Sequence, residues 1–355
     1  MSRLRFNIRR QPWQLDPPFV IAGEVWSRID SVVVELMDRE GRVGRSETQG
    51  VSYRGETFET ICAQLETVRK RVESGLSVSD LQVVLPAGGA RSALDVALWD
   101  LASSQQARPV HQMIGLDHLN PVETVFTIGL KSLAEAAEEA VRKSAFRQIK
   151  IKADAERHLD VISAIRAVRP DADLIVDANQ SWSFSLLREL APELLRLRVS
   201  VIEQPLPEKQ DEELEGYSCP VLLMADESCH DCADLEVVGR RYGAVNIKID
   251  KTGGLTEAIR LHRRASQIGL KTMVGNMCGG SLAMAPAYLI AQHTDYADID
   301  GPLLQTEDWP SPLRYKGGLV SPPEGPLWGG LHHKVPCPDG VAFGGSGRFE
   351  DGSHE

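Results

Sequence analysis

From about residue 124 onward, short apolar runs alternate with longer segments in which apolar residues recur at helical spacing. This alternation is typical of parallel strands joined by crossover helices. The runs are "TVFTIG", "QIKIK", "DLIVDA", "VSVIEQP", "VLLMADE", "AVNIKI", "KTMVG" and "YADID". The pattern therefore predicts eight strands with seven helical segments between them.

Eight such strands can close into a (β/α) barrel or form an open, doubly wound sheet. No G-x-G-x-x-G motif follows the first strand, which counts against the open nucleotide-binding sheet. Pro302, Pro310 and Pro312 follow the eighth run and leave no room for a last crossover helix. We therefore predict an α/β fold of the modified TIM barrel type, (β/α)7β, over residues 121–313.

The first 120 residues have a different pattern. The stretch "DSVVVELMDREGRVGRSET" alternates as a β-hairpin does, and residues 56–73 form a helical stretch. In "ARSALDVALWDLASSQQARP", Leu94, Leu98 and Leu101 share one helix face. Residues 1–120 are therefore predicted to be a separate α+β unit, and the Gly- and Pro-rich residues 314–355 a segment that returns to it.

Composition narrows the possible partners. The formal net charge of −11 argues against nucleic acid and anionic membranes, which bind clustered Lys and Arg. No apolar run approaches the ~18 residues that span a bilayer, and no apolar segment follows the basic N-terminus. We therefore expect a cytoplasmic protein with a small-molecule substrate. The six cysteines form no disulfide framework, and Cys229 and Cys232 lack the second half of a zinc site.

Ionisable residues share the inward-facing parity at the ends of several predicted strands. Side chains alternate between the two faces of a strand, and barrel active sites lie where strands end and loops begin. The residues that meet both conditions are Lys150, Lys152, Asp177, Glu203, Asp226, Lys248, Asp298 and Asp300. We expect these residues to line one pocket.

Asp177, Glu203 and Asp226 end three successive strands at similar heights. Three carboxylates cannot all stay ionised in a dry pocket without a cationic partner. A hard divalent cation meets that need, and oxygen-only ligands favour Mg²⁺ over zinc. The sequence therefore predicts a Mg²⁺ site, with salt bridges to the barrel lysines as the alternative.

Lys152 and Lys248 come from strands that are four apart, so they should face each other across the mouth of an eight-strand barrel. A substrate carboxylate held on the metal would place its α-carbon between these two amines, which suits proton removal on one side and delivery on the other. A nearby cation lowers the pKa of a lysine. We therefore expect Lys152 and Lys248 to be catalytic, and Lys150 to hold a substrate oxygen.

The sequence resembles the enolase superfamily, and within it the muconate-lactonising and dipeptide-epimerase branch. The matching pieces are "KIK", "VDANQSW", "IEQP", "ADES" and "NIKIDKTGG", in this order and one βα unit apart. Strand seven, "KTMVGNM", lacks the histidine base of the mandelate-racemase type. The resemblance implies an N-terminal α+β capping domain over residues 1–120, an enediolate intermediate, Mg²⁺ and a homo-oligomer.

The resemblance also implies where a substrate binds. "YADID" resembles the D-x-D element with which dipeptide epimerases hold the substrate ammonium group, here Asp298 and Asp300. Two cap loops, "AGEVWSR" and "TQGVSYRGET", would set specificity. Glu24 favours a cationic second residue, whereas Trp26 and Tyr53 favour an apolar or aromatic one, and the sequence does not decide between them.

We therefore predict a Mg²⁺-dependent dipeptide epimerase, an isomerase that inverts the α-carbon of the C-terminal residue. An N-acylamino-acid racemase, and an o-succinylbenzoate synthase or cycloisomerase of the same fold, remain alternatives. A metal-dependent hydrolase and a binding protein without catalysis are alternatives of other classes, and neither has a need for two facing amines.

Overall fold

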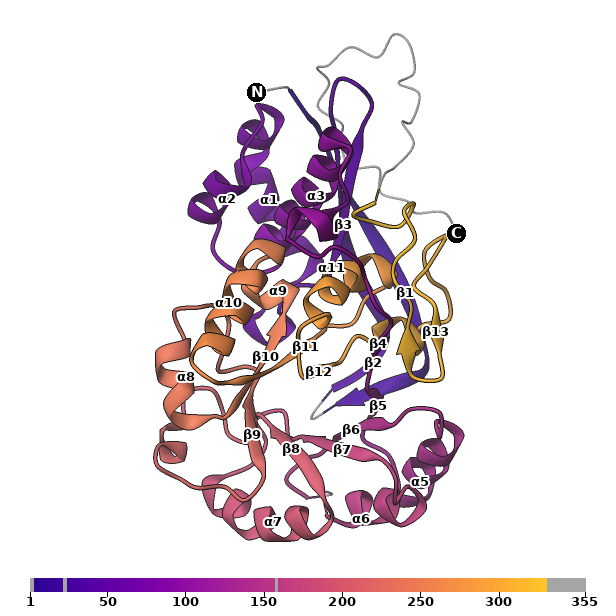
Figure 1. Ribbon diagram of the computed structural model, residues 1–355, viewed down its shortest axis with the longest axis vertical. Helices are drawn as coiled ribbons and strands as arrows, with labels where there is room; N and C mark the ends of the chain where they lie inside the picture. Colours follow the sequence, from indigo (N-terminus) through magenta and orange to yellow (C-terminus); the bar gives the residue numbers. More distant parts are fainter. Residues whose placement is uncertain (1–2, 22–23, 157–158, 331–355) are drawn as a thin grey trace.

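The computed structural model describes residues 3–21, 24–156 and 159–330. In Figure 1 a mostly indigo and purple unit lies above a curled sheet that is surrounded by helices. The upper unit is built from the first part of the chain, and the curled sheet from the part that follows. The predicted division into an α+β capping domain and a barrel-like α/β unit is thus seen in the fold.

The capping domain holds an antiparallel sheet covered by helices. The hairpin predicted over residues 30–48 is confirmed, because β2 and β3 pair antiparallel from Val32 opposite Thr48 to Met37 opposite Val43. Both predicted helices are also present. The elements are β1 (Arg5–Ile21), β2 (Glu24–Met37), β3 (Val43–Thr48), η1 (Ser52–Arg54), α1 (Phe58–Glu73), α2 (Val78–Val84), α3 (Gly89–Gln106) and α4 (Val110–Met113).

The second unit contains eight parallel strands in the order in which they occur along the chain. The sheet curls until its first and last strands approach each other, where the Val125 N–H donates to the Ala297 carbonyl at 2.9 Å. The result is an open, barrel-like sheet, as the fold-class prediction requires. The strands are β5 (Phe126–Ile128), β6 (Gln148–Lys152), β7 (Asp173–Asp177), β8 (Val199–Glu203), β9 (Leu222–Ala225), β10 (Ala244–Lys248), β11 (Lys271–Gly275) and β12 (Tyr296–Ala297).

Helices join successive strands on the outside of the sheet, with one exception (Figure 1). Between β8 and β9 the described chain forms only the 3-10 turn η2 (Glu212–Leu214), so the prediction of a seventh helical segment was wrong there. Pro205, Pro207 and Pro220 interrupt this connection and prevent a regular helix. The other helices are α5 (Leu133–Arg142), α6 (Leu159–Val168), α7 (Phe184–Arg196), α8 (Leu235–Arg241), α9 (Ile249–Thr252), α10 (Leu255–Gln267) and α11 (Ser281–Ala291).

The interior of the curled sheet has an apolar floor. Ile175, Val201 and Met224 are fully buried and form part of one cluster with residues from the neighbouring strands. Each of them comes two residues before a carboxylate at the end of its own strand, so the carboxylates lie one layer higher on the same face. The apolar floor therefore supports a polar layer at the carboxyl ends of the strands.

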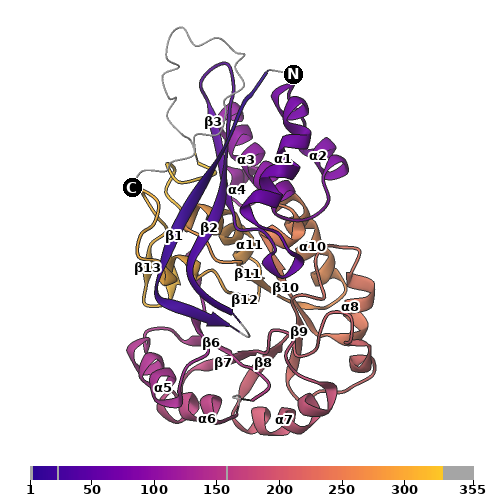
Figure 2. The same cartoon turned by 180° about the vertical axis from the view of Figure 1, so that it is seen from behind.

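The capping domain reaches the barrel unit through its long β1–β2 hairpin. Figures 1 and 2 both show the end of β1 and the beginning of β2 beside the start of the curled sheet, and the Leu130 N–H donates to the Val20 carbonyl at 2.9 Å. A separate small sheet is formed by the strands β4 (Val122–Glu123), β13 (Tyr315–Lys316) and β14 (Leu319–Val320). A further 3-10 turn, η3 (Gly301–Leu304), follows β12.

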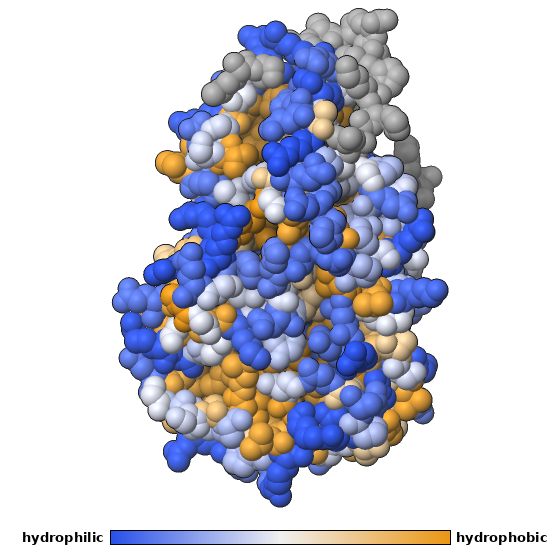
Figure 3. Space-filling view, in the orientation of Figure 1, coloured by the Kyte–Doolittle hydropathy of each residue, from blue (hydrophilic) through white to orange (hydrophobic). Residues whose placement is uncertain are grey.

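The described part of the C-terminal segment contacts the capping domain. The Trp328 indole donates to the Val96 carbonyl at 3.3 Å, and the Gly329 N–H donates to Asp100 Oδ1 at 2.6 Å. Residues 331–355 of the predicted segment lie outside the described residues. Within residues 3–330, without the two gaps, no helix is long and apolar enough to cross a bilayer, and the face in Figure 3 mixes hydrophilic with smaller apolar areas.

Candidate active site

The carboxyl ends of β6 to β10 bring the predicted carboxylates and lysines into one layer. In the parallel registers, Lys152 pairs with Asp177 and Asp177 pairs with Glu203. Asp226 directly follows β9 and Lys248 ends β10. Asp177, Glu203 and Asp226, which we call the acidic arc, are completely buried.

Lys150 lies among these carboxylates. Its ammonium nitrogen lies 3.0 Å from Asp177 Oδ2, 2.9 Å from Glu203 Oε2 and 2.8 Å from Asp298 Oδ2. The side chain is only 2% exposed, so these contacts are poorly screened by solvent. Lys150 therefore joins the acidic arc to the predicted D-x-D element.

Lys152 and Lys248 contact opposite ends of the acidic arc. The Lys152 ammonium lies 2.8 Å from Asp177 Oδ2, and the Lys248 ammonium lies 2.8 Å from Asp226 Oδ2. Their strands, β6 and β10, are separated by β7, β8 and β9 in the curled sheet. The two amines thus approach one layer of carboxylates from different walls of the barrel.

Burial and neighbouring charges change the acidity of these groups. Burial raises the pKa of Glu203 to about 7, and the charge of Asp177 acts in the same direction. Burial also raises the pKa of Asp177, but Lys150 and Lys152 outweigh it and lower that pKa to about 2. The pKa of Lys248 is lowered by burial but raised more strongly by Asp226 and Glu203, so it lies above its usual value.

The acidic arc has the donor chemistry for a hard divalent cation. Among the described residues, no group of three His, Cys, Asp or Glu side chains is arranged to hold a metal ion. The cation that lies between Asp177 and Glu203 is the Lys150 ammonium. Nevertheless Glu203 Oε2 and Asp226 Oδ2 accept no hydrogen bond of good geometry, although lysine ammonium groups lie within 3 Å. Two buried carboxylate oxygens that face only positively charged groups fit a hard cation such as Mg²⁺.

The predicted D-x-D element lies at the end of the sheet next to Lys150. Asp298 and Asp300 are both buried, and Asp300 Oδ2 accepts a hydrogen bond from the Thr127 N–H at 2.7 Å. Burial and the charge of Asp298 together raise the pKa of Asp300 to about 7. The Asn276 amide donates to the Asp298 carbonyl at 2.7 Å.

Two of the predicted specificity residues, Trp26 and Tyr53, lie on β2 and η1 of the capping domain. The side chain of Glu24 lies outside the described part of the structure, and residues 24–28 belong to strand β2, where a loop was expected. Trp26 packs in an apolar cluster with Cys278, and burial together with the charge of Asp300 raises the pKa of that thiol to about 12. The Tyr53 hydroxyl lies 3.4 Å from His230 Nε2 on the loop after β9.

Sequence reasoning missed Asn246 and Lys251, whose side chains donate to carboxylate oxygens of the acidic arc. The Asn246 amide donates to Glu203 Oε1 at 2.8 Å, and the Lys251 ammonium donates to Asp226 Oδ1 at 2.6 Å. Asn246 shares the inward parity of Lys248, so strand alternation could have identified it. Lys251 lies in the short helix α9, and its position relative to Asp226 depends on a turn that periodicity does not predict.

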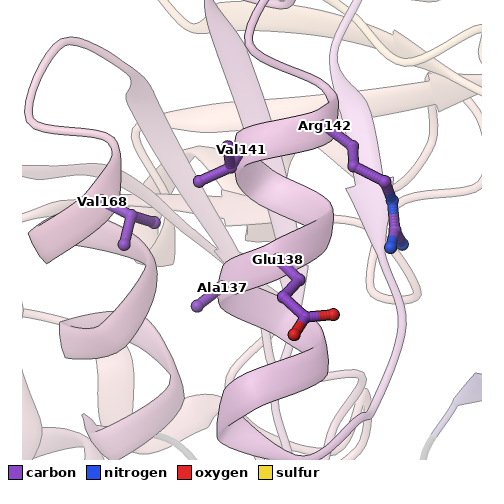
Figure 4. A pocket seen from close by; sticks show the side chains of 5 residues that line it. All are labelled: Ala137, Glu138, Val141, Arg142 and Val168. Carbon is purple, nitrogen blue, oxygen red and sulfur yellow. The ribbon is translucent and has the colours of Figure 1, made fainter.

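A surface hollow lies elsewhere, between α5 and α6 (Figure 4). Its lining residues are Ala137, Glu138, Val141, Arg142 and Val168. None of them belongs to the charged layer described above, and the mostly apolar lining carries a single carboxylate, that of Glu138.

Comparison with known proteins covers nearly the whole described chain. Residues 3–115 match the protein family "Mandelate racemase / muconate lactonizing enzyme, N-terminal domain". Residues 132–330 match the family "Enolase C-terminal domain-like". The chain is 38% identical over 304 residues to the N-acetyl-D-glutamate racemase of Pseudoalteromonas sp., covering 85% of this chain and 96% of the racemase. It is 38% identical over 314 residues to the L-Ala-D/L-Glu epimerase of Escherichia coli K12, covering 88% and 98% of the two chains.

Solved structures are similar over the same extent. An enolase family member from Agrobacterium tumefaciens with homology to dipeptide epimerases, solved with sodium and L-Ala-L-Glu, has a TM-score of 0.90 at 36% identity. That comparison covers 92% of this chain and 100% of the other. The dipeptide epimerase from Enterococcus faecalis V583, solved with Mg and L-Leu-L-Tyr, has a TM-score of 0.85 at 26% identity, over 93% and 99% of the two chains.

Proposed function

The chain belongs to the enolase superfamily, and on that premise we propose that it is a Mg²⁺-dependent dipeptide epimerase that inverts the α-carbon of the C-terminal residue. The observation that carries the proposal is the arrangement of Lys152 and Lys248, which contact opposite ends of the acidic arc from strands four apart. Inversion by proton transfer needs an acid and a base on opposite faces of one carbon. Two lysines so placed meet that requirement.

In this proposal the two lysines exchange roles according to the configuration of the substrate. For one configuration Lys152 removes the α-proton and Lys248 delivers a proton to the other face, and for the opposite configuration the roles reverse. Loss of the α-proton leaves an enediolate, and Lys150 offers it a buried positive charge. The low exposure of Lys150 and Lys248 keeps water away from this intermediate.

Asp177, Glu203 and Asp226 would hold the metal, and their oxygen-only chemistry favours Mg²⁺. When bound, the cation supplies positive charge beside the substrate carboxylate and offsets the carboxylates that hold the Lys248 pKa above its usual value. The Mg in the Enterococcus faecalis epimerase structure supports this choice.

Asp298 and Asp300 would bind the substrate ammonium group. Both carboxylates are buried at the same end of the sheet as Lys150, and a buried carboxylate pair binds a cation strongly. Trp26 and Tyr53, from the capping domain, would contact the rest of the dipeptide, and Glu24 begins the same strand as Trp26. Similarity to an L-Ala-D/L-Glu epimerase makes L-Ala-L-Glu the first substrate to test.

An N-acylamino-acid racemase is the second candidate, and one observation favours it. The N-acetyl-D-glutamate racemase of Pseudoalteromonas sp. is as similar to this chain as the Escherichia coli epimerase is, at 38% identity. Such a substrate has no free amine. It would therefore make no use of Asp298 and Asp300 as ammonium ligands.

The experiment is a panel of dipeptides and N-acylamino acids incubated with the enzyme and MgCl₂ in D₂O. A dipeptide epimerase should invert the C-terminal residue of some dipeptides and add one deuterium at that α-carbon, as read by chiral chromatography and mass spectrometry. Inversion confined to N-acylamino acids would support the second candidate. Hydrolysis of the dipeptides without deuterium at the α-carbon would contradict both.

A further inference from the structure

Lys251 is a completely buried cation that the proposed chemistry does not use. Its ammonium donates to Asp226 Oδ1 at 2.6 Å, to the Asp226 carbonyl at 2.5 Å and to the Asn246 carbonyl at 2.9 Å. These three acceptors use all three donors of a lysine ammonium. Lys251 therefore fixes both the backbone and one side-chain oxygen of Asp226.

Asn246 holds one side-chain oxygen of Glu203, as Lys251 holds one of Asp226. Its amide donates to Glu203 Oε1 at 2.8 Å from the next strand but one, and both residues are fully buried. The neighbouring strand provides space for this amide, because a Cβ atom on Gly275 would lie 2.5 Å from Asn246 Oδ1. The local sequence thus keeps a polar side chain against Glu203.

Together these contacts distinguish the two oxygens of each of two carboxylates, those of Asp226 and Glu203. Lys251 takes Oδ1 of Asp226 and Asn246 takes Oε1 of Glu203. The remaining oxygens, Asp226 Oδ2 and Glu203 Oε2, are the two that accept no hydrogen bond of good geometry. Each carboxylate therefore has one oxygen held by Lys251 or Asn246, while its other oxygen faces a lysine ammonium, that of Lys248 for Asp226 and that of Lys150 for Glu203. A metal ion bound at these oxygens would take the place of the two ammonium groups.

We propose that Lys251 and Asn246 are positioning residues that restrict Asp226 and Glu203 to one metal-binding oxygen each and thereby select Mg²⁺ over Ca²⁺. The proposal rests on the proposed function, because it assumes that the acidic arc binds the metal. Mg²⁺ requires six oxygens in near-ideal octahedral geometry, whereas the larger Ca²⁺ accepts bidentate carboxylates and up to eight oxygens. Releasing Oδ1 or Oε1 makes bidentate binding possible, which favours the larger ion.

The test measures cation binding without substrate. The full chain, freed of metal with EDTA, is titrated with MgCl₂ and separately with CaCl₂ by isothermal titration calorimetry. Asn246→Leu keeps the shape and charge of the site, whereas Lys251→Met removes a charge as well as a donor. Lys271→Met, at the exposed start of β11, is the control. Thermal melts of the metal-free proteins report folding, and if Lys251→Met does not fold, Asn246→Leu carries the test.

We expect Asn246→Leu to weaken Mg²⁺ binding by about tenfold to a hundredfold, the usual effect of losing a group that orients a metal ligand, with a smaller change for Ca²⁺. Lys251→Met removes a positive charge and therefore changes the affinities for both ions, but the ratio of its Mg²⁺ affinity to its Ca²⁺ affinity should also fall. The control Lys271→Met should have the same ratio as the wild type. An unchanged ratio in Asn246→Leu would overturn the proposal, as would a wild-type protein that binds neither ion. A lowered ratio in a protein that epimerises no dipeptide would support the proposal and refute only the proposed reaction.

Discussion

The Lys150 ammonium lies 2.8 Å from Asp298 Oδ2, although Lys150 lies on β6 and Asp298 follows β12. This contact depends on the curling of the sheet, which brings its two ends together. Because Lys150 also contacts Asp177 and Glu203, one cation connects the proposed metal ligands with the proposed ammonium ligands. The two halves of the proposed substrate site are therefore electrostatically coupled.

Asp298→Asn should raise the KM for a dipeptide with a free amine by about tenfold to a hundredfold, because a charge-assisted hydrogen bond contributes about 1.5–3 kcal/mol. Steady-state kinetics measures the change. The same dipeptide with an acetylated amine, used as an inhibitor, is the control for any disturbance of Lys150. If the variant weakens both ligands equally, Asp298 does not bind the amine.

Lys152→Met and Lys248→Met should each lower epimerisation by about a hundredfold to ten-thousandfold, the usual contribution of a general acid or base. Each variant retains one amine, so it should still exchange the α-proton of one substrate configuration with D₂O, and the two variants should act on opposite configurations. Proton NMR in D₂O follows the exchange. Lys271→Met should behave as the wild type, since Lys271 lies at the exposed start of β11.

Equal loss of exchange for both configurations in either lysine variant would contradict the two-base arrangement. A variant that still inverts the substrate at the wild-type rate would remove its lysine from the mechanism.

Removal of the divalent cation should abolish activity and lower stability. A ligand at a hundred times its Kd stabilises the folded state by about 2.7 kcal/mol, so MgCl₂ should raise the melting temperature of EDTA-treated protein. Asp226→Asn, which removes the charge of a proposed metal ligand, should reduce this increase. Sodium chloride of equal ionic strength is the control, and an equal effect of both salts would argue against a specific site.

Much of the barrel was predictable because its strands are buried on both faces. Such strands appear in the sequence as nearly continuous apolar runs, and all eight runs became strands of one sheet. Strand alternation then places Lys150, Asp177 and Glu203 on the inner face. The η2 connection was missed because helical propensity was extended across a segment that contains three prolines.

The contacts of the site were less predictable because they depend on closure and on turns. The sequence places Lys150 and Asp298 148 positions apart, and only the curled sheet brings them together. Lys251 reaches Asp226 from a four-residue helix, where neither strand nor helix periodicity applies. Asn246 has no charge, so a search for ionisable strand ends passes over it.

Gly44→Ala should destabilise the capping domain strongly. A Cβ atom at this position of β3 would lie 2.2 Å from the Ala97 carbonyl oxygen and 2.4 Å from the Leu101 nitrogen of α3, and backbone atoms cannot move aside as a side chain can. Overpacking of this kind costs about 1–3 kcal/mol or more, which urea unfolding measures. Gly239→Ala, in helix α8 with ordinary contacts only, should be neutral or stabilising by up to about 1 kcal/mol.

Asp95 should make stability depend on pH. Burial raises its pKa from 3.8 to about 6, although Thr256 and Arg91 lower it. Between these values the folded state holds a proton that the unfolded chain releases, so stability falls as pH rises from about 4 to about 6 and the loss persists above that range. The asparagine side chain of Asp95→Asn cannot ionise. It can still accept a hydrogen bond from the Thr256 N–H, which donates to Asp95 Oδ1 at 3.0 Å in the wild type, and it can still hydrogen-bond to Gln82. In urea unfolding, the free energy of unfolding of the variant minus that of the wild type should therefore increase by about 2 kcal/mol as the pH rises from 4.5 to 7.5. A constant difference across this range would mean that Asp95 titrates as an ordinary carboxyl, whose interactions with Arg91 and Thr256 outweigh its burial.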